Sequence, residues 1–209
     1  MLKVLVAGFG PFPGAPHNPS GDLALALGRM RRPGLASVKI HAHVFPTIYA
    51  AVAKELPRLL TKYDPDAVLL FGLAGRSDRV RIETRAVNAA SLIHPDAARS
   101  VPLSRKLYPK AAVELFVRPE IRRLIAAARR GGLPARLSRD AGRYVCNASL
   151  FTCLDKTRGK RRPLVTFIHI PWPRARNIRP RNGKQPSAMA LFRAGEAILR
   201  ALVAETQRK

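Results

Sequence analysis

The chain has 209 residues, of which 47% are apolar and 24% charged, a composition typical of a folded domain and not of a disordered segment. No run approaches the roughly 18 apolar residues of a membrane helix, and the two cysteines, Cys146 and Cys153, fit neither a disulfide framework nor a zinc pattern. The net charge of +25 suggests an acidic partner such as nucleic acid or an anionic membrane, a hypothesis that the rest of the sequence must support.

The N-terminal half alternates predicted strands with predicted helices. The apolar run Leu2–Ala7 predicts a buried strand, and the Gly- and Pro-rich residues 8–14 predict a loop. Ser20 is expected to cap a helix over Asp22–Arg29, and Thr47 a second helix that ends near Lys62. Further strands are predicted over residues 38–44 and 67–71.

Residues 80–87 alternate strictly between the two sides of a predicted strand. Val80, Ile82, Thr84 and Ala86 share one side, and Arg79, Arg81, Glu83 and Arg85 share the other. This period of two predicts a single strand with one face exposed to polar surroundings.

The C-terminal half continues the alternation. Helices are predicted from Pro119 to residue 128, from Cys146 to about Lys156, and over 188–207, with strands at 135–137 and 164–170. We therefore predict one α/β domain over residues 1–209, a three-layer α/β/α sandwich with a twisted, mostly parallel central sheet. Ligands of such sheets bind beyond the carboxyl ends of the strands.

Several common motifs are missing. Gly8, Gly10 and Gly14 depart by one residue from the dinucleotide fingerprint, and two prolines occupy positions where a phosphate would need backbone N–H groups. No phosphate-binding GxxxxGK[ST], HExxH or GxSxG sequence occurs.

Three residues could form a nucleophilic site. Cys146 begins a predicted helix, whose N-terminus lowers a thiol's pKa and can hold an oxyanion, although a free cysteine is more commonly a small buried hydrophobe, as expected for Cys153. His169 ends a predicted strand, where it is either a general base or a structural hydrogen-bonding group. Glu83 is either the carboxylate that orients the imidazole or one half of a surface ion pair.

Four blocks of sequence join these residues into one pattern. They are Gly8-Phe9-Gly10-Pro11-Phe12 with Asn18-Pro19-Ser20, Gly72-Leu73-Ala74-Gly75-Arg76 with Glu83 and Asn88, Asp140-Ala141-Gly142 through Cys146-Asn147, and Phe167-Ile168-His169-Ile170-Pro171. In this order they resemble the pyroglutamyl peptidase I (pyrrolidone-carboxylate peptidase) family of cysteine peptidases.

The resemblance implies a cysteine exopeptidase that removes N-terminal pyroglutamyl residues from peptides without metal or cofactor. Cys146 would be the nucleophile, His169 the general base and then acid, and Glu83 the group that orients His169. The resemblance also assigns the pocket for the lactam ring: Phe9 and Phe12 on its two faces, Asn18 fixing the loop, and Tyr144 and Val145 as walls. It further implies a homo-oligomer, dimer or tetramer, and the missing secretory signal predicts a cytoplasmic protein.

The sequence also departs from the family. Pro13 replaces a usual glycine, Thr84 a usual arginine, and Ile93 the arginine that assists the oxyanion hole, for which Arg85 or Arg99 could substitute. Loss of one oxyanion donor typically costs about 100- to 1000-fold in rate. An alternative is therefore a diverged member with another acyl substrate or weak activity.

The positive charge gathers in the second half of the chain. Between Lys156 and Lys184 lie ten Lys and Arg residues and no acid, which leaves a basic nucleic-acid-associating protein as a further alternative. Aromatic residues that could stack on bases are sparse there, so we expect no specific nucleic acid and no membrane as partner. Near Cys146 and His169 the surplus is instead expected to lower the thiol's pKa and to favour acidic peptides.

Overall fold

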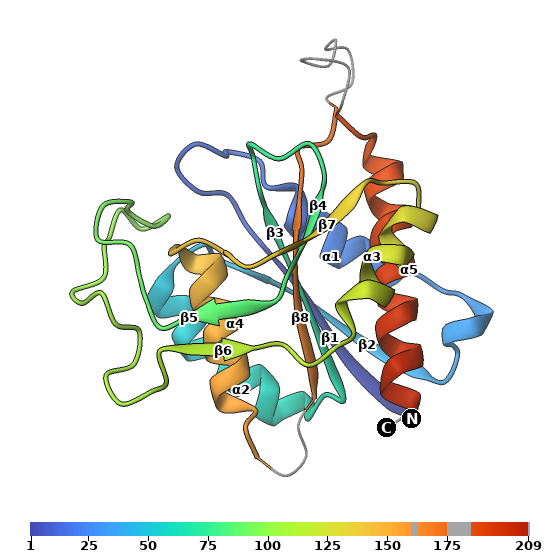
Figure 1. Ribbon diagram of the computed structural model, residues 1–209, viewed down its shortest axis with the longest axis horizontal. Coiled ribbons are helices and arrows are strands. Elements are labelled where there is room, and N and C mark those ends of the chain that lie inside the picture. The colour runs from blue at the N-terminus through green and yellow to red at the C-terminus, as the bar shows by residue number, and fades with distance from the viewer. Residues whose placement is uncertain (160–162, 175–184, 209) are drawn as a thin grey trace.

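The computed structural model describes residues 1–159, 163–174 and 185–208, and within them six strands form a central sheet in the order β2-β1-β3-β8-β4-β7 (Figure 1). Neighbouring strands are parallel except for β4 and β8, which are antiparallel. The strands are β1 (Leu2–Phe9), β2 (Val38–Phe45), β3 (Ala67–Leu73), β4 (Val80–Glu83), β7 (Ala135–Ser138) and β8 (Leu164–Ile170). The prediction of an α/β fold with a mostly parallel sheet is confirmed.

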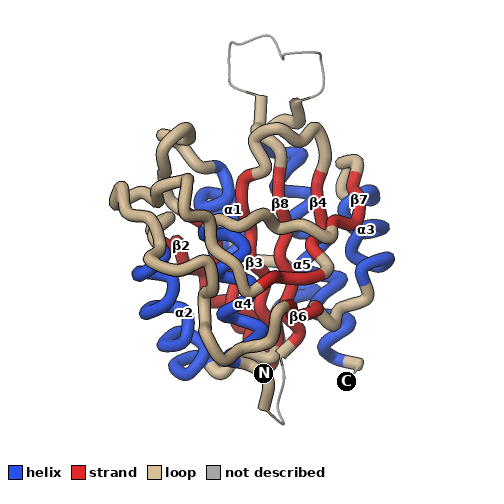
Figure 2. Tube along the Cα trace, turned by 60° about the vertical axis from the view of Figure 1, so that its left-hand side comes forward, coloured by secondary structure: helices blue, strands red, loops and turns tan. Residues whose placement is uncertain are grey.

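Helices cover both faces of the sheet (Figures 1 and 2). One apolar cluster joins the sheet to α1 (Pro19–Arg29), α3 (Ile121–Arg130) and α5 (Ala188–Gln207). A second cluster on the opposite face joins it to α2 (Tyr49–Tyr63) and α4 (Val145–Lys156). Because β1, β3 and β8 are buried between two helical layers, their sequences are nearly continuous apolar runs.

Two helix starts differ from the prediction. Asn18, and not Ser20, caps α1, because its side chain accepts from the backbone N–H of Ser20 and Pro19 fits the first helical position. Thr47 does not cap α2, since its hydroxyl donates to the carbonyl of Gly10 at 2.8 Å, and a carboxylate oxygen of Asp96 accepts from the N–H of Tyr49 instead.

The predicted strand over residues 80–87 is two strands in different sheets. β4 ends at Glu83, and after Thr84 the chain continues as β5 (Arg85–Val87), which pairs with β6 (Glu114–Phe116) in a separate two-stranded sheet. The backbone N–H of Thr84 donates to Ser138 on the β7 side, and its carbonyl accepts from Val117 on the β6 side. Thr84 is thus the residue at which the chain passes from one sheet to the other. β6 was not predicted, because three residues are too few to show the alternation of apolar and polar side chains that marks a strand.

Two smaller observations complete the fold. A single turn of 3₁₀ helix (Pro33–Leu35) precedes β2. Within the ranges that the structure describes, no helix is both long enough and apolar enough to cross a membrane.

Candidate active site

A cavity of about 290 Å³ opens at the carboxyl ends of β1, β3 and β8, where parallel sheets collect their ligands. Its lining includes six residues that the sequence had singled out: Phe9, Phe12, Asn18, Tyr144, Cys146 and His169. Thr47, Leu73, Ala74, Arg81, Asp140, Ala141 and Gly142 complete it. Segments far apart in the chain therefore meet at one small, partly apolar chamber.

The imidazole of His169 is held by a buried carboxylate. Nδ1 of His169 lies 2.8 Å from Oε1 of Glu83, and both side chains are almost completely excluded from solvent. Because an ionised carboxylate can only accept, Nδ1 must carry the proton, which leaves Nε2 of the neutral imidazole as a proton acceptor. Glu83 is not on an exposed face, so the interpretation as a surface ion pair is wrong.

Cys146 is the second residue of α4, as its predicted place in the first helical turn requires. Its sulfur lies above Gly72, since a β-carbon added to Gly72 would be only 2.9 Å from Sγ. Gly72 is paired in register with His169 on the neighbouring strand. The absence of a side chain at Gly72 therefore makes room for the thiol on the side of the sheet that carries the cavity.

Burial first, and then the negative charge of Glu83, raise the pKa of the Cys146 thiol to about 12. Arg81 lowers this pKa, but by less. The expectation that the basic surplus would lower the pKa is wrong, because burial and the near carboxylate outweigh positive charges that are mostly exposed to solvent. A thiol with this pKa is neutral near pH 7, and it would need a base to act as a nucleophile.

The loop before α4 has a defined turn geometry. Oδ1 of Asp140 accepts from the N–H of Gly142, whose φ of +80° suits glycine. Tyr144 is the N-cap residue and makes no capping bond through its side chain. The backbone N–H groups at the start of α4, that of Cys146 included, are accordingly directed away from the helix and can donate to an anion.

Asn147 fixes the position of the nucleophilic helix. Its amide is fully buried, with Oδ1 accepting from the N–H of Val87 at 2.9 Å and Nδ2 donating to the carbonyls of Val87 and Ala89. These bonds connect α4 with β5. In the sequence Asn147 stands out only as part of the motif around Cys146 and as a polar residue among apolar neighbours in α4.

The aromatic residues of the cavity differ in burial and in the rings that they contact. Phe9 is buried in the floor, with its ring 5.9 Å from Phe45 and 6.3 Å from Phe167, whereas Phe12 is partly exposed and its ring lies 5.9 Å from Tyr144. The hydroxyl of Tyr144 donates to the carbonyl of Pro95 at 2.9 Å, which anchors this wall.

Asn18 closes the first loop. Its Nδ2 donates to the carbonyl of Gly10 at 3.0 Å. Between them, Phe12 and Ala15 exchange backbone hydrogen bonds around Pro13 and Gly14. Proline is favoured at the first central position of such a turn, and Gly14 with a φ of +89° at the second, so the turn accepts Pro13.

Val145 was expected to line the pocket but does not. It is fully buried in the apolar cluster between the sheet and α4, because the first residue of that helix directs its side chain into the core.

The arginines expected to compensate for Ile93 also lie elsewhere. Arg85 contacts Glu114 and the carbonyl of Arg139, and Arg99 is exposed in a loop; neither lines the cavity. Ile93 itself is 81% exposed. The arginine that does line the cavity is Arg81, which the sequence analysis counted only as part of an exposed strand face.

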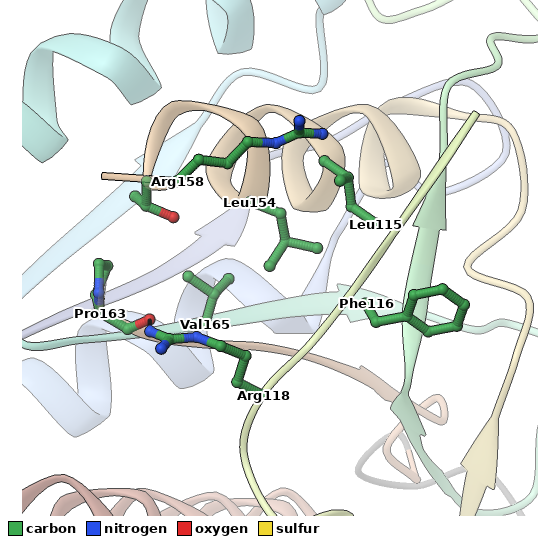
Figure 3. Close-up of a pocket in the computed structure, with 8 residues that line it drawn as sticks. Leu115, Phe116, Arg118, Leu154, Arg158, Pro163 and Val165 are labelled. Atoms are coloured by element: carbon green, nitrogen blue, oxygen red, sulfur yellow. Dashed lines mark hydrogen bonds between the residues drawn. The ribbon is translucent and has the colours of Figure 1, made fainter. Parts of the chain in front are cut away.

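A second cavity of about 310 Å³ lies elsewhere, between α4, β6 and the start of β8 (Figure 3). Its lining is Leu115, Phe116, Arg118, Leu154, Thr157, Arg158, Pro163 and Val165. Arg118 donates to the carbonyl of Pro163 at 2.8 Å. None of these lining side chains is a thiol, an imidazole or a carboxylate.

The expectations about nucleic acid and about metal ions can be compared with the described residues only. Of the ten basic residues from Lys156 to Lys184, all but Lys156, Arg158 and Arg174 lie outside the described residues, so the nucleic-acid alternative stays a prediction. Within the described ranges, no three His, Cys, Asp or Glu side chains gather in a way that could hold a metal ion.

Comparison with known proteins places the whole chain in one group. A family model described as pyroglutamyl peptidase matches residues 2–208. Pyrrolidone-carboxylate peptidase of Thermococcus kodakarensis is 33% identical over 172 residues, covering 82% of each chain, and that of Gloeobacter violaceus is 30% identical over 205 residues, covering 98% of each. A mutant pyrrolidone carboxyl peptidase of Pyrococcus furiosus has a similar structure, with a TM-score of 0.88 at 26% identity over 98% of this chain and all of that one.

Proposed function

Because the chain belongs to the pyroglutamyl peptidase family, we propose that it is a cysteine peptidase that removes N-terminal pyroglutamyl residues from peptides, with Cys146, His169 and Glu83 as its catalytic residues. One observation carries the assignment of the residues. The hydrogen bond between Glu83 and Nδ1 of His169, 2.8 Å long and buried, leaves Nε2 free to accept a proton at the cavity that Cys146 also lines. That is the arrangement a thiol with a raised pKa requires.

The reaction proceeds by acyl transfer. Nε2 of His169 takes the thiol proton as Sγ of Cys146 forms a bond to the pyroglutamyl carbonyl carbon, and the resulting oxyanion accepts a hydrogen bond from the backbone N–H of Cys146. His169 then gives the proton to the departing amine nitrogen as the C–N bond breaks. Water, deprotonated by His169, hydrolyses the thioester and releases pyroglutamate. Glu83 keeps the imidazole in the required tautomer and stabilises its charged form.

The cavity suits a small, flat, uncharged ring. Phe9 and Phe12 supply aromatic surface for the two faces of the lactam, and Tyr144 supplies a wall held in place by its own hydrogen bond. The peptide that follows the pyroglutamyl residue leaves through the mouth of the cavity. We treat residues 1–209 as one catalytic domain; a dimer or tetramer and a cytoplasmic location stay predictions.

The direct test uses the two cysteines of α4 as a matched pair. Wild-type protein is expected to release aminocoumarin from pyroglutamyl-aminocoumarin, Cys146→Ala to lose this activity while keeping its thermal unfolding midpoint, and Cys153→Ala to keep the activity, because Cys153 is buried in the core.

Three other outcomes count against the proposal. Turnover by Cys146→Ala would remove this residue from the mechanism. Rapid iodoacetamide labelling of Cys146 without hydrolysis would show that the thiol is reactive but that the substrate is not a pyroglutamyl peptide. It would favour the alternative of a diverged member with another acyl substrate. Equal loss of activity in Cys146→Ala and Cys153→Ala would show that the loss comes from a disturbed α4 and not from the missing thiol of Cys146.

A further inference from the structure

We propose that Arg81 is a positioning residue of this site: it supplies the charge that compensates buried Glu83 while His169 is neutral, and it ties Glu83 to the loop before the nucleophile. The inference rests on the proposed function, because it concerns the groups that serve Cys146.

Strand register brings Arg81 to the site. β4 runs antiparallel to β8, and the pairing sets Arg81 opposite His169 and Glu83 opposite Phe167. Since residues two apart in a strand share a face, Arg81 and Glu83 emerge on the same side of the sheet, which is also the side of the His169 imidazole. On the polar face of the predicted strand, Arg81 therefore lines the cavity and Glu83 is buried beside it, whereas Arg79 is exposed to solvent.

The contacts of Arg81 converge on the catalytic carboxylate. Its Nη2 lies 3.2 Å from Oε1 of Glu83, the same oxygen that accepts from His169, and the Arg81 side chain is only 23% exposed. Among the described residues, neither Oε2 of Glu83 nor Nε of Arg81 has a hydrogen-bond partner. The pair is therefore held mainly by its opposite charges, and a carboxylate buried without a cation would carry a large desolvation cost.

The same guanidinium also holds the wall of the cavity. Nη2 of Arg81 donates to Oγ of Ser138 at 2.8 Å and to the carbonyl oxygen of Asp140. Ser138 ends β7, and the chain from Asp140 to Gly142 lines the cavity just before α4 begins. Arg81 therefore joins the carboxylate, the edge strand and the loop that leads to Cys146.

This position gives Arg81 an effect on protonation. Glu83 contacts His169, and Asp140, Tyr144, Cys146 and Arg81 line the same cavity; of these groups Arg81 alone carries a permanent positive charge. Because His169 and Arg81 both contact one oxygen, at 2.8 and 3.2 Å, the two nitrogens are within about 6 Å of each other. At that separation the permanent charge of Arg81 opposes a second positive charge on the imidazole. Arg81 thus keeps His169 available as a base.

The test measures the pH profile of kcat/KM on pyroglutamyl-aminocoumarin. Arg81→Met is expected to move the acid limb of the profile upward by at least about one pH unit, so that activity lost near neutrality recovers at alkaline pH. Arg81→Lys is expected to keep the limb near its wild-type position, because the charge is retained. Arg79→Met is the matched control, since Arg79 is exposed, pairs with Asp78 and loses the same charge.

Ser138→Ala separates the two roles of Arg81. It removes the hydrogen bond from the guanidinium and the one from the N–H of Asp140 without changing charge, and it is expected to raise KM without moving the acid limb. A uniform loss of activity in Arg81→Met at every pH, with the limb unmoved, would overturn the proposal and leave Arg81 a structural residue only. Should Arg81→Met fail to fold, Arg81→Gln makes the same measurement with a polar neutral side chain.

A second measurement needs no substrate. In a Cys146→Ala background, the imidazole Cε1–H signal of His169 is followed by NMR as a function of pH, with His169→Ala to assign it. Adding Arg81→Met is expected to raise the titration midpoint by at least about one unit. If this shift is seen but no pyroglutamyl substrate is hydrolysed by the wild type, the proposed function fails and the role of Arg81 stands. An unchanged midpoint overturns the role of Arg81 whatever the activity.

Discussion

Gly72→Ala is a small change placed directly under the nucleophile. A β-carbon at this position would lie 2.7 Å from Cζ of Phe167 and 2.9 Å from Sγ of Cys146. Both atoms belong to packed groups, Phe167 to a fully buried strand and Cys146 to the first turn of α4. The added methyl group cannot avoid displacing at least one of them.

The size of the effect follows from the contact distances. Non-bonded heavy atoms rest at about 3.5–4.0 Å, so the sulfur must retreat by up to about 1 Å. A misplacement of about 1 Å at a reacting group can cost roughly 100-fold in rate. Overpacking of a filled core typically costs about 1–3 kcal/mol, which for a chain of this length lowers Tm by several degrees.

The assay compares kcat/KM on pyroglutamyl-aminocoumarin and Tm for the wild type, Gly72→Ala and Gly159→Ala. The control adds the same methyl group where no atom of the described residues lies within 4 Å, so it is expected to change neither quantity. We expect Gly72→Ala to lose about 100-fold in kcat/KM while remaining folded. Activity within threefold of wild type, with Tm unchanged, would refute the placement of the thiol above Gly72.

Three further predictions concern the same site. Glu83→Gln keeps the shape but removes the charge that fixes the imidazole tautomer, so kcat should fall at least about 100-fold with little change in KM; a change in KM alone would contradict the orienting role. In His169→Ala, the raised pKa of Cys146 keeps the thiol protonated at neutral pH, and the thiolate fraction rises with pH below that pKa; iodoacetamide labelling should therefore accelerate about tenfold per pH unit from 7 to 10, whereas a plateau below pH 9 would show an ordinary thiol. Phe12→Ala should raise KM at nearly constant stability because the ring is partly exposed, and Phe9→Ala should lose about 3–5 kcal/mol of unfolding free energy because that ring is buried; urea titrations showing equal losses would contradict this division.

Much of the fold could be predicted because buried parallel strands have a simple sequence signature. Leu2–Ala7, Ala67–Phe71 and Leu164–Ile170 are apolar except at Lys3, Thr166 and His169, and the structure places these strands side by side in the sheet. Helix starts were less readable, because the groups that satisfy the first N–H groups come from other parts of the chain. Asp96, far from α2 in sequence, accepts from Tyr49, and no local pattern announces this contact.

The candidate site was predictable in its chemistry but not in its surroundings. Motif order brought Cys146, His169 and Glu83 together, and the structure sets Glu83 against His169 with Cys146 at the same cavity. Period-two alternation, however, cannot distinguish a polar face in solvent from one turned toward a buried site. For that reason Arg81 was overlooked, and Glu83 was left open as a surface group.

β8 stands in the middle of the sheet although it is the last strand of the described chain. During synthesis, β3 keeps one unpaired edge and β4 lacks its inner neighbour until residues 164–170 have left the ribosome. His169 arrives with that same strand, 86 residues after the carboxylate that orients it. The growing chain therefore lacks the contact between Glu83 and His169 until its sheet closes, and until then β3 and β4 each keep an unpaired edge that another chain could join.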